Sequence, residues 1–393
     1  MPGPPYAGLK VLDMSQGIAG PYVGVLLGQQ GAQVIKVEPP SGDWIRVTGG
    51  GKDGMTALAV ANNLGKRSIC IDAGKPAGRD LVLKLAARAD IFLENFRPGV
   101  MSRLGLDYAA LAAVNARLIY LSISGFGDTG PEVHKPATDS VVQAKTGMAA
   151  ANKDANGVPR RIGILVPDNV TALYATQCVA AALYARDKNG KMGTGRHIQL
   201  SLAECCAAFQ AAPILDDFLF TGQFKPPITV PAGVFATRDG HIVLATLRDA
   251  MWVSLCKAIN REEWLSEPLY ATSDLRKQHS QAINTLVAEV LPTRDTVEWT
   301  ALFEEHDVLC APVQNYAQLR EDAQIRHMGY FGTVEQAPFG AIPMPRFPGT
   351  GRAGPLPPAP RVGEHSREIL AEAGCAAAEI AALEQAGLVM QAA

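Results

Sequence analysis

Short apolar segments typical of strands alternate with segments typical of helices over the first third of the chain, and this alternation limits the possible folds most strongly. Strands joined through helices must run parallel, because each helical connection crosses back over the sheet in a right-handed sense. We expect strands at residues 9–12, 33–38, 67–72, 90–96 and 118–127, and helices at 21–31, 76–89 and 108–115. The sequence therefore predicts an α/β fold with a Rossmann-like parallel sheet.

The turns that follow four of these strands are rich in Gly, Pro or polar residues. They lie at Ser15–Gly17, Glu38–Pro40, Asn95–Arg97 and Ser124–Gly127. Because ligands on a parallel sheet bind outside the carboxyl ends of the strands, we expect these turns to line a ligand site.

The rest of the chain indicates a second, smaller unit. A long helix is predicted over Thr171–Arg186, and the spacing of five residues indicates its buried face: Val170, Leu173, Tyr174, Cys178 and Ala181. Two short strands are predicted around a turn at Asp239–Gly240, followed by helical segments. We expect a large domain of residues 1–205 and 328–393, a small α/β domain of residues 226–320, and linkers at 206–225 and 321–327.

Composition favours a small-molecule partner. The 393 residues are 48% hydrophobic and carry a net charge of −2, so the protein has no positive field to attract nucleic acid or an anionic membrane. The N-terminus lacks a secretory signal and no stretch approaches about 18 consecutive apolar residues, which predicts a cytoplasmic protein. The seven cysteines form no CxxC pair and have no His at metal-ligand spacing, so we expect reduced thiols and no metal.

Basic and amide residues gather at or just after the predicted strand ends. A ligand with several phosphates needs such donors, although the same residues are also compatible with a scattered, solvated surface. The candidates are Arg46, Lys66, Arg67, Asn95, Arg97, Arg103 and Lys135. No GxGxxG, P-loop or GxSxG pattern is present, which argues against nicotinamide binding, ATP binding and serine hydrolysis.

Asp168 stands immediately before the long predicted helix, in IGILVPDNVTALYA. A carboxylate there receives free backbone N–H groups and the positive end of the helix dipole, so we expect it to stay ionised and fixed in direction. The residues alone leave two roles open for Asp168, a helix N-cap or a reactive carboxylate.

Several segments taken together resemble the class III CoA-transferase family, which includes formyl-CoA transferase, carnitine CoA-transferase and the related α-methylacyl-CoA racemases. The resemblance covers nearly the whole chain and is carried by GLKVLDMSQGIAGPYVGVLLGQQGAQVIKVEPPSGDWIR, NLGKRSICID, ENFRPGVMSRLGLDY, SISGFGDTGP, DSVVQAKTG, the Asp168 segment, ALYARDKNGKMGTGRHIQLSLAE and VGEHSREIL. It implies an interlocked homodimer of ring-like chains. Each large domain is then built from both chain ends, with the small domain between them.

By this resemblance, Asp168 matches the family's nucleophilic aspartate, which forms an acyl–aspartyl anhydride and then an aspartyl–CoA thioester. The implied contacts to coenzyme A are Gln16, Ala19, Lys66, Asn95, Phe96, Arg97, Arg103 and Lys135. Acyl-CoA and a small carboxylic acid are the implied substrates. Gln16 and Ile18 replace a His and a Gln of formyl-CoA transferase, and that enzyme's glycine-rich loop has no counterpart around Val230–Asp239, which disfavours the formyl/oxalate pair.

Two other functions stay open. The racemases of the family place a His–Asp pair where this chain has Thr138–Asp139, so a racemase or another acyl-CoA isomerising enzyme lacks one acid/base group here. The other open function is that of a CoA-binding protein without catalysis, in which Asp168 is only a helix cap. Succinate-like dicarboxylates, branched hydroxy acids and carnitine-like zwitterions all remain open as substrates.

Overall fold

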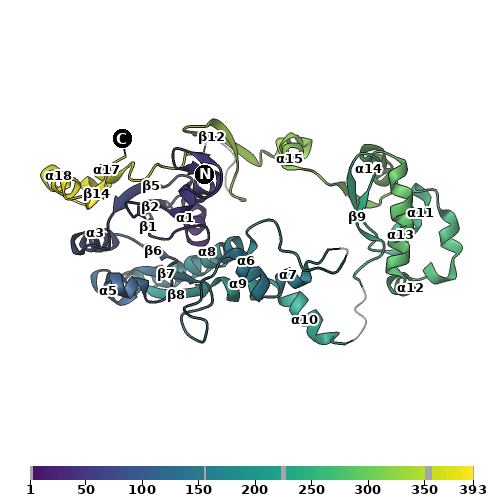
Figure 1. The fold of residues 1–393 in the computed structure, drawn as a ribbon, viewed down its shortest axis with the longest axis horizontal. Helices are drawn as coiled ribbons and strands as arrows, with labels where there is room; N and C mark the ends of the chain where they lie inside the picture. The colour runs from purple at the N-terminus through teal and green to yellow at the C-terminus, as the bar shows by residue number, and fades with distance from the viewer. Residues whose placement is uncertain (1–2, 155, 223–226, 350–355, 393) are drawn as a thin grey trace. The chain divides into compact units, whose positions relative to one another are not determined.

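The computed structural model describes residues 3–154, 156–222, 227–349 and 356–392 (Figure 1). The chain divides into two compact units, one made of Met1–Pro213 and Gly329–Ala393, the other of Ile214–Met328. The segments expected as linkers are largely helical, because α9 (Leu202–Phe209), α10 (Ala211–Leu219), α15 (Tyr316–Glu321) and α16 (Ala323–Met328) occupy them. Residues 223–226, where the first expected linker meets the small domain, lie outside the described residues.

A seven-stranded sheet forms the centre of the first unit, in the order β14-β5-β2-β1-β6-β7-β8. Its strands are β1 (Lys10–Asp13), β2 (Gln33–Glu38), β5 (Arg67–Ile71), β6 (Ile91–Glu94), β7 (Ile119–Ser124), β8 (Arg196–Ser201) and β14 (Val389–Met390). All neighbours pair in parallel except β14, which runs antiparallel to β5. The predicted parallel α/β sheet is confirmed.

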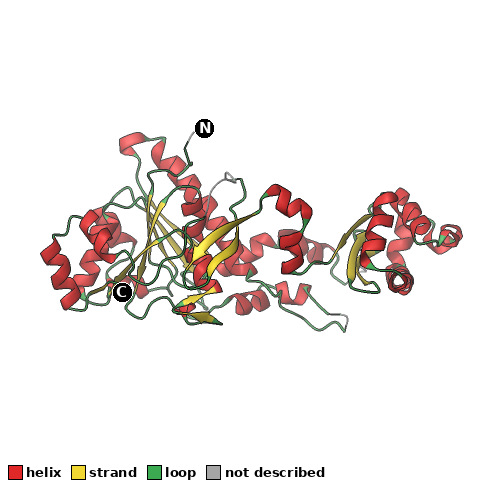
Figure 2. Ribbon diagram, turned by 90° about the horizontal axis from the view of Figure 1, so that it is seen from above, coloured by secondary structure: helices red, strands yellow, loops and turns green. Residues whose placement is uncertain are grey.

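Helices cover both faces of this sheet (Figure 2). Successive residues of β1 point to opposite faces, so Val11 packs with α1 (Ala19–Gln29) and α8 (Val166–Asp187), whereas Leu12 packs with α3 (Pro76–Ala86). The other helices of this unit are α2 (Ala57–Asn63), α4 (Val100–Leu104), α5 (Tyr108–Val114), α6 (Asp139–Lys145), α7 (Met148–Ala151), α17 (Ser366–Glu372) and α18 (Ala377–Gln385). Among the described residues, no helix combines the length and apolarity that a membrane crossing needs.

The buried face predicted for α8 is wrong in part. Val170 is buried, but Leu173 is 55% exposed. The buried positions are instead Thr171, Ala172, Ala175, Val179, Ala182 and Leu183. Small side chains let α8 pack closely on α1, so the large apolar residues do not mark the face that is covered.

The second unit contains a three-stranded antiparallel sheet in the order β11-β10-β9, with β9 at Ala232–Ala236, β10 at His241–Ala245 and β11 at Leu309–Pro312. This confirms the two strands predicted around Asp239–Gly240. Beside the sheet lie α11 (Asp249–Ala258), α12 (Ser273–Gln278), α13 (Ser280–Val290) and α14 (Thr296–Glu305), and the core of this unit includes Trp252, Trp299 and Phe303.

The proline-rich segment after Met328 contains structure that the sequence did not predict. Strands β12 (Phe331–Gln336) and β13 (Gly340–Pro345) of this segment form an antiparallel hairpin. Elsewhere in the chain, β3 (Gly51–Lys52) pairs with β4 (Met55–Thr56). The chain then returns to the large sheet through α17, α18 and β14, so residues from both ends of the chain share one core.

Candidate active site

The site lies where the strand order reverses. Strands β1 and β6 are neighbours, but the chain leaves β1 toward β2 and β6 toward β7, which opens a crevice at their carboxyl ends. Two reciprocal hydrogen bonds join the turns that follow these strands. The Gln16 N–H donates to Asn95 Oδ1 at 2.7 Å, and Asn95 Nδ2 donates to the Gln16 carbonyl at 2.6 Å. Asn95 therefore fixes the Gln16 turn against the Asn95–Arg97 turn.

A cavity of about 500 Å³ opens at this point. It brings together most of the residues predicted for the site, which are Gln16, Ala19, Asn95, Phe96, Arg97, Lys135 and Asp168. Trp44, Thr138 and Asp139 also line it. The cavity is thus lined by the turns that follow β1, β6 and β7 and by helices α6 and α8, as expected for a ligand site on a parallel sheet.

Lys66 is not part of the cavity lining, so the cavity gives no support to its predicted contact with coenzyme A. Its Nζ is buried beneath the turn and donates to Asp13 Oδ2 at 2.7 Å, the Pro21 carbonyl at 2.7 Å and Asn63 Oδ1 at 3.2 Å. A lysine ammonium has three donors, and these three acceptors use all of them. Lys66 is therefore a structural residue under the site.

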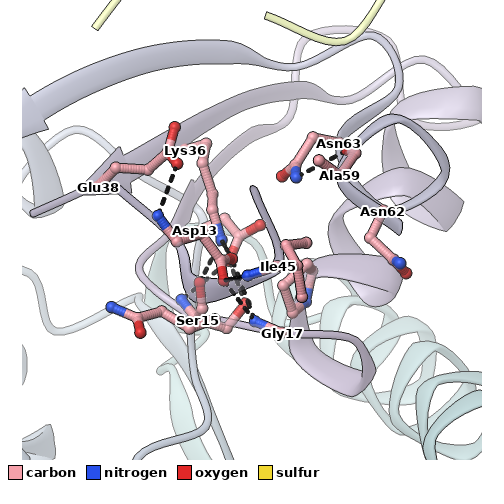
Figure 3. A network of polar contacts seen from close by, with 12 residues as sticks. Asp13, Ser15, Gly17, Lys36, Glu38, Ile45, Ala59, Asn62 and Asn63 are labelled. Atoms are coloured by element: carbon pink, nitrogen blue, oxygen red, sulfur yellow. Dashed lines mark hydrogen bonds and ion pairs between the residues drawn. The ribbon is translucent and has the colours of Figure 1, made fainter. Parts of the chain in front are cut away.

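A buried network of charges holds the turn that carries Gln16 (Figure 3). Asp43 accepts the Gly17 N–H at 3.0 Å and pairs with Lys36 Nζ at 3.1 Å, and Lys36 also contacts the Ser15 carbonyl. Gly17 has a φ of 77°, and a Cβ on it would lie 2.6 Å from the Trp44 ring, so the turn requires glycine. Sequence reasoning missed this network, although a lysine inside the apolar strand 33–38 was a signal for it.

Arg46 and Arg67 are also absent from the cavity, which corrects their place on the predicted phosphate-binding rim. Arg46 is buried and binds both carboxylate oxygens of Glu38, at 2.7 and 2.8 Å. Arg67 pairs with Glu368 at 3.1 Å and with Glu372 at 2.9 Å. Both guanidinium groups already have carboxylate partners, so they stabilise the fold rather than wait for a ligand.

Three basic side chains remain available near the cavity. Arg97 is exposed in the cavity lining, and Arg103 is exposed at the end of α4, outside the lining. Neither has an ion-pair partner in the described part of the chain. Lys135 pairs with Glu132 at 2.8 Å, but Glu132 also pairs with Lys145 at 2.6 Å. The rim of the cavity therefore keeps a net positive charge.

Asp168 lies inside the first turn of α8, not before it, so the N-cap role is wrong. The helix begins at Val166, its N-cap is Leu165, and no side chain caps it. Pro167 fits the first turn, because a proline there gives up no helical hydrogen bond. Within the described residues, the Asp168 carboxyl makes no hydrogen bond and faces the cavity.

The expectation that Asp168 stays firmly ionised is also wrong. Burial raises the pKa of Asp168 to about 7, and the negative charge of Asp139 adds to this effect. The positive end of the helix does not compensate for lost solvation and a like charge. Near pH 7 this carboxyl is therefore divided between its neutral and charged forms.

Within the described residues, no group of three or more His, Cys, Asp or Glu side chains is arranged to hold a metal ion. The chemistry that the cavity offers comes from the Asp139 and Asp168 carboxyls in its wall and the basic side chains at its rim.

The fold and the cavity define an α/β protein with a ligand site at the switch point of its parallel sheet. A family model described as CoA-transferase family III matches residues 6–366. The chain therefore belongs to this enzyme family, as its sequence motifs predicted.

Known relatives match most of the chain. The chain is 31% identical to the succinate–glutarate CoA-transferase of Agrobacterium fabrum, with 94% of this chain and 96% of that protein covered. It is 32% identical to the acetyl-CoA:oxalate CoA-transferase of Acetobacter aceti, over 81% of this chain and 82% of that one. A CAIB/BAIF family protein from Brucella suis is 30% identical and superimposes with a TM-score of 0.84, covering 95% of this chain and 100% of that structure.

Proposed function

We propose that the protein moves CoA from an acyl-CoA donor to a carboxylic acid acceptor, with Asp168 as the nucleophile. The observation that carries this proposal is the Asp168 carboxyl, which lies in the cavity wall without a hydrogen-bond or ion-pair partner from the described protein. A carboxyl that served as an N-cap would accept a hydrogen bond from a backbone N–H of the first turn. A desolvated carboxylate is a stronger nucleophile than a hydrated one, and family membership supplies the thioester substrate.

The first half of the reaction loads CoA on the enzyme. The Asp168 carboxylate attacks the thioester carbonyl carbon, the C–S bond breaks, and CoA thiolate leaves an acyl–aspartyl anhydride. The thiolate then attacks the aspartyl carbonyl, which releases the donor acid and forms an aspartyl–CoA thioester.

The second half reverses these steps with the acceptor. Its carboxylate attacks the aspartyl–CoA carbonyl and displaces the thiolate, which forms a new anhydride. The thiolate then attacks the acceptor's carbonyl, so that a new acyl-CoA leaves and the Asp168 carboxylate is restored.

Coenzyme A is proposed to bind along the loop that carries Asn95, Phe96 and Arg97. Phe96 is half-buried in the cavity lining and offers an aromatic face for the adenine. Arg97, Lys135 and Arg103 supply donors for the phosphates, because their charges are not neutralised one-to-one within the protein. Ala19 and the Gln16 turn then lie beside the thioester arm.

A short dicarboxylic acid is the proposed acceptor or the acyl group of the donor. The two relatives described above are named for succinate, glutarate and oxalate. Gln16 and Ile18 depart from the residues of formyl-CoA transferase, so we place succinate and glutarate ahead of oxalate.

We also propose the interlocked homodimer that the resemblance implies. Helix α10 supports association, because Ile214, Leu215, Phe218 and Leu219 are each at least 50% exposed. Apolar surface of this kind typically marks a protein contact. Light scattering on the purified protein tests the assembly state.

Intact-protein mass spectrometry after incubation with succinyl-, glutaryl-, acetyl- and oxalyl-CoA tests the function. We expect a covalent adduct that hydroxylamine releases, mapped to the Asp168 peptide, and none in Asp168→Asn. Retained turnover in Asp168→Asn would contradict the proposal, and deuterium uptake at the α-carbon of the acyl group would favour a racemase instead.

A further inference from the structure

A second carboxyl in the cavity wall is not used by the proposed mechanism. Asp139 opens helix α6 and lines the same cavity as Asp168, although only 5% of its surface is exposed. One of its carboxyl oxygens, Oδ1, accepts a hydrogen bond from Gln143 Nε2 at 2.7 Å. The other, Oδ2, is buried and has no hydrogen-bond partner among the described residues.

Gln143 determines which oxygen of Asp139 carries a proton. The Ile162 backbone N–H donates to Gln143 Oε1 at 2.8 Å, and a backbone N–H can only donate a hydrogen bond, never accept one. The oxygen end of the Gln143 amide is therefore fixed at Ile162, which leaves Nε2 as a donor toward Asp139 Oδ1. Oδ1 must accept this bond, so the proton of the neutral acid lies on Oδ2.

The surroundings favour the neutral acid. Burial raises the pKa of Asp139, and Gln143, the Asp168 backbone N–H and the Arg161 guanidinium offset this only in part. The other titratable groups that face Asp139 are the Asp168 carboxyl on α8 and the Cys206 thiol on α9. The negative charge of Asp139 raises the pKa of Asp168, so the protonation of one carboxyl affects that of the other.

A buried polar atom without a partner is energetically unfavourable. Because Asp139 lines the cavity, a bound ligand is the available partner for Oδ2. We propose that Asp139, as a neutral acid, donates a hydrogen bond from Oδ2 to the oxygen of the acyl carbonyl while Asp168 attacks the carbon of that carbonyl. This inference rests on the proposed function. Negative charge develops on that oxygen, and a buried neutral carboxylic acid is a known kind of donor to such an oxyanion.

Asp139→Asn and Asp139→Ala separate this role from a structural one. In Asp139→Asn, the side-chain oxygen faces Gln143 Nε2, so the NH₂ group takes the place of the Oδ2 hydroxyl as a permanent donor. We expect it to retain kcat/KM for acyl-CoA within about threefold, whereas Asp139→Ala loses about 10²–10³-fold in kcat with little change in acyl-CoA binding. An inactive Asp139→Asn, or an Asp139→Ala with normal kcat, would overturn the proposal.

The pH profile provides a second measurement that does not depend on the alanine variant folding. In the wild type, kcat/KM should fall at high pH, because Asp139 then loses its proton and the donor disappears. Asp139→Asn should lack this fall and should keep full activity at lower pH, because removal of the like charge lowers the pKa of Asp168. Ionisation of Asp168 raises activity through about pH 7, so a wild-type profile that shows no fall at higher pH would exclude the role of Asp139.

Mass spectrometry on the same proteins distinguishes failure of this inference from failure of the proposed function. If the wild type forms the Asp168 adduct and Asp139→Ala forms it at the normal rate, only the role of Asp139 fails. If no acyl-CoA of the panel modifies Asp168 and Asp168→Asn stays active, the proposed transfer mechanism fails, and the role of Asp139 fails with it.

Discussion

Asp13 and Asp168 are both buried carboxyls, yet their pKa values shift in opposite directions. Burial alone would raise the pKa of Asp13, but Lys66 and Lys36 outweigh it and hold that pKa below its usual value. Asp168 has no cationic partner among the described residues, so burial, together with the negative charge of Asp139, raises its pKa to about 7. The comparison teaches that the partner, and not the depth, decides whether a buried carboxyl stabilises the fold or remains available for chemistry.

The largest effect is expected at Asp168, where Asp168→Asn removes the carboxylate and keeps the shape. We expect kcat to fall by roughly 10³-fold or more while the midpoint of urea unfolding does not fall. Steady-state kinetics and urea denaturation measure the two quantities on the same sample. A large loss of stability with partial activity would place Asp168 with the paired carboxylates instead.

Breaking the buried ion pair between Asp13 and Lys66 should instead lower the stability of the protein. Lys66→Met leaves Asp13 buried without its 2.7 Å partner, so the free energy of unfolding should fall by about 3–5 kcal/mol. Asp13→Asn/Lys66→Met is the matched control, because it removes both charges and should recover much of this loss. Urea unfolding measures each variant, and equal losses in the single and double variants would show that the pair does not account for the effect.

The same contrast between paired and unpaired groups applies to two arginines, with a smaller expected effect. Arg97→Ala should raise KM for acyl-CoA about tenfold with no change in the unfolding midpoint, because this exposed side chain has no ion-pair partner in the described chain. Arg46→Ala should instead lower stability, because it leaves Glu38 buried without its guanidinium. If Arg97→Ala destabilised the protein and left KM unchanged, the distinction between free and paired arginines would not hold.

The smallest expected effect concerns Glu94, a third buried carboxyl that lacks a cationic partner. Burial raises the pKa of Glu94 to about 7, and hydrogen bonds from Ser122 and the Phe96 N–H oppose this only in part. Its contribution to stability is full below pH 4.5 and is lost as pH rises through 7, because the folded protein binds the proton more tightly than the unfolded chain. Relative to the wild type, Glu94→Gln should therefore be more stable at pH 8 than at pH 5, measured by urea unfolding at both values. An equal effect at both pH values would mean that Glu94 does not titrate between them.

Local patterns predicted the sheet well, because strand and helix periodicity depends on neighbouring residues. The strand at residues 33–38 has the predicted bounds, and the Asn95–Arg97 turn lies in the cavity lining as expected. The spacing of residues in the sequence could not show which basic side chains face the cavity. Lys66 binds Asp13, which lies 53 positions away in the chain, and the sequence does not reveal such a pairing.

The start of α8 and the state of Asp168 were wrong for related reasons. The helix begins earlier than the apolar pattern, and Pro167 was the available signal for this boundary. The pKa of Asp168 depends on burial and on Asp139, a residue of another helix, so no local rule for helix ends gives its direction. The orientation of Asp139 depends in turn on Gln143 and Ile162, which come together only in the folded chain.

The return of the C-terminal segment to the large sheet has a consequence for folding during synthesis. Ile369, Leu370 and Val389 complete the core on one face of the sheet, and β14 covers the edge of β5. A ribosome makes these residues only after it has made the whole unit of Ile214–Met328. The later unit can therefore fold while the sheet that was made first still has an uncovered apolar face. The order of folding then differs from the order of translation, and the N-terminal part of the nascent chain needs protection for the longest time.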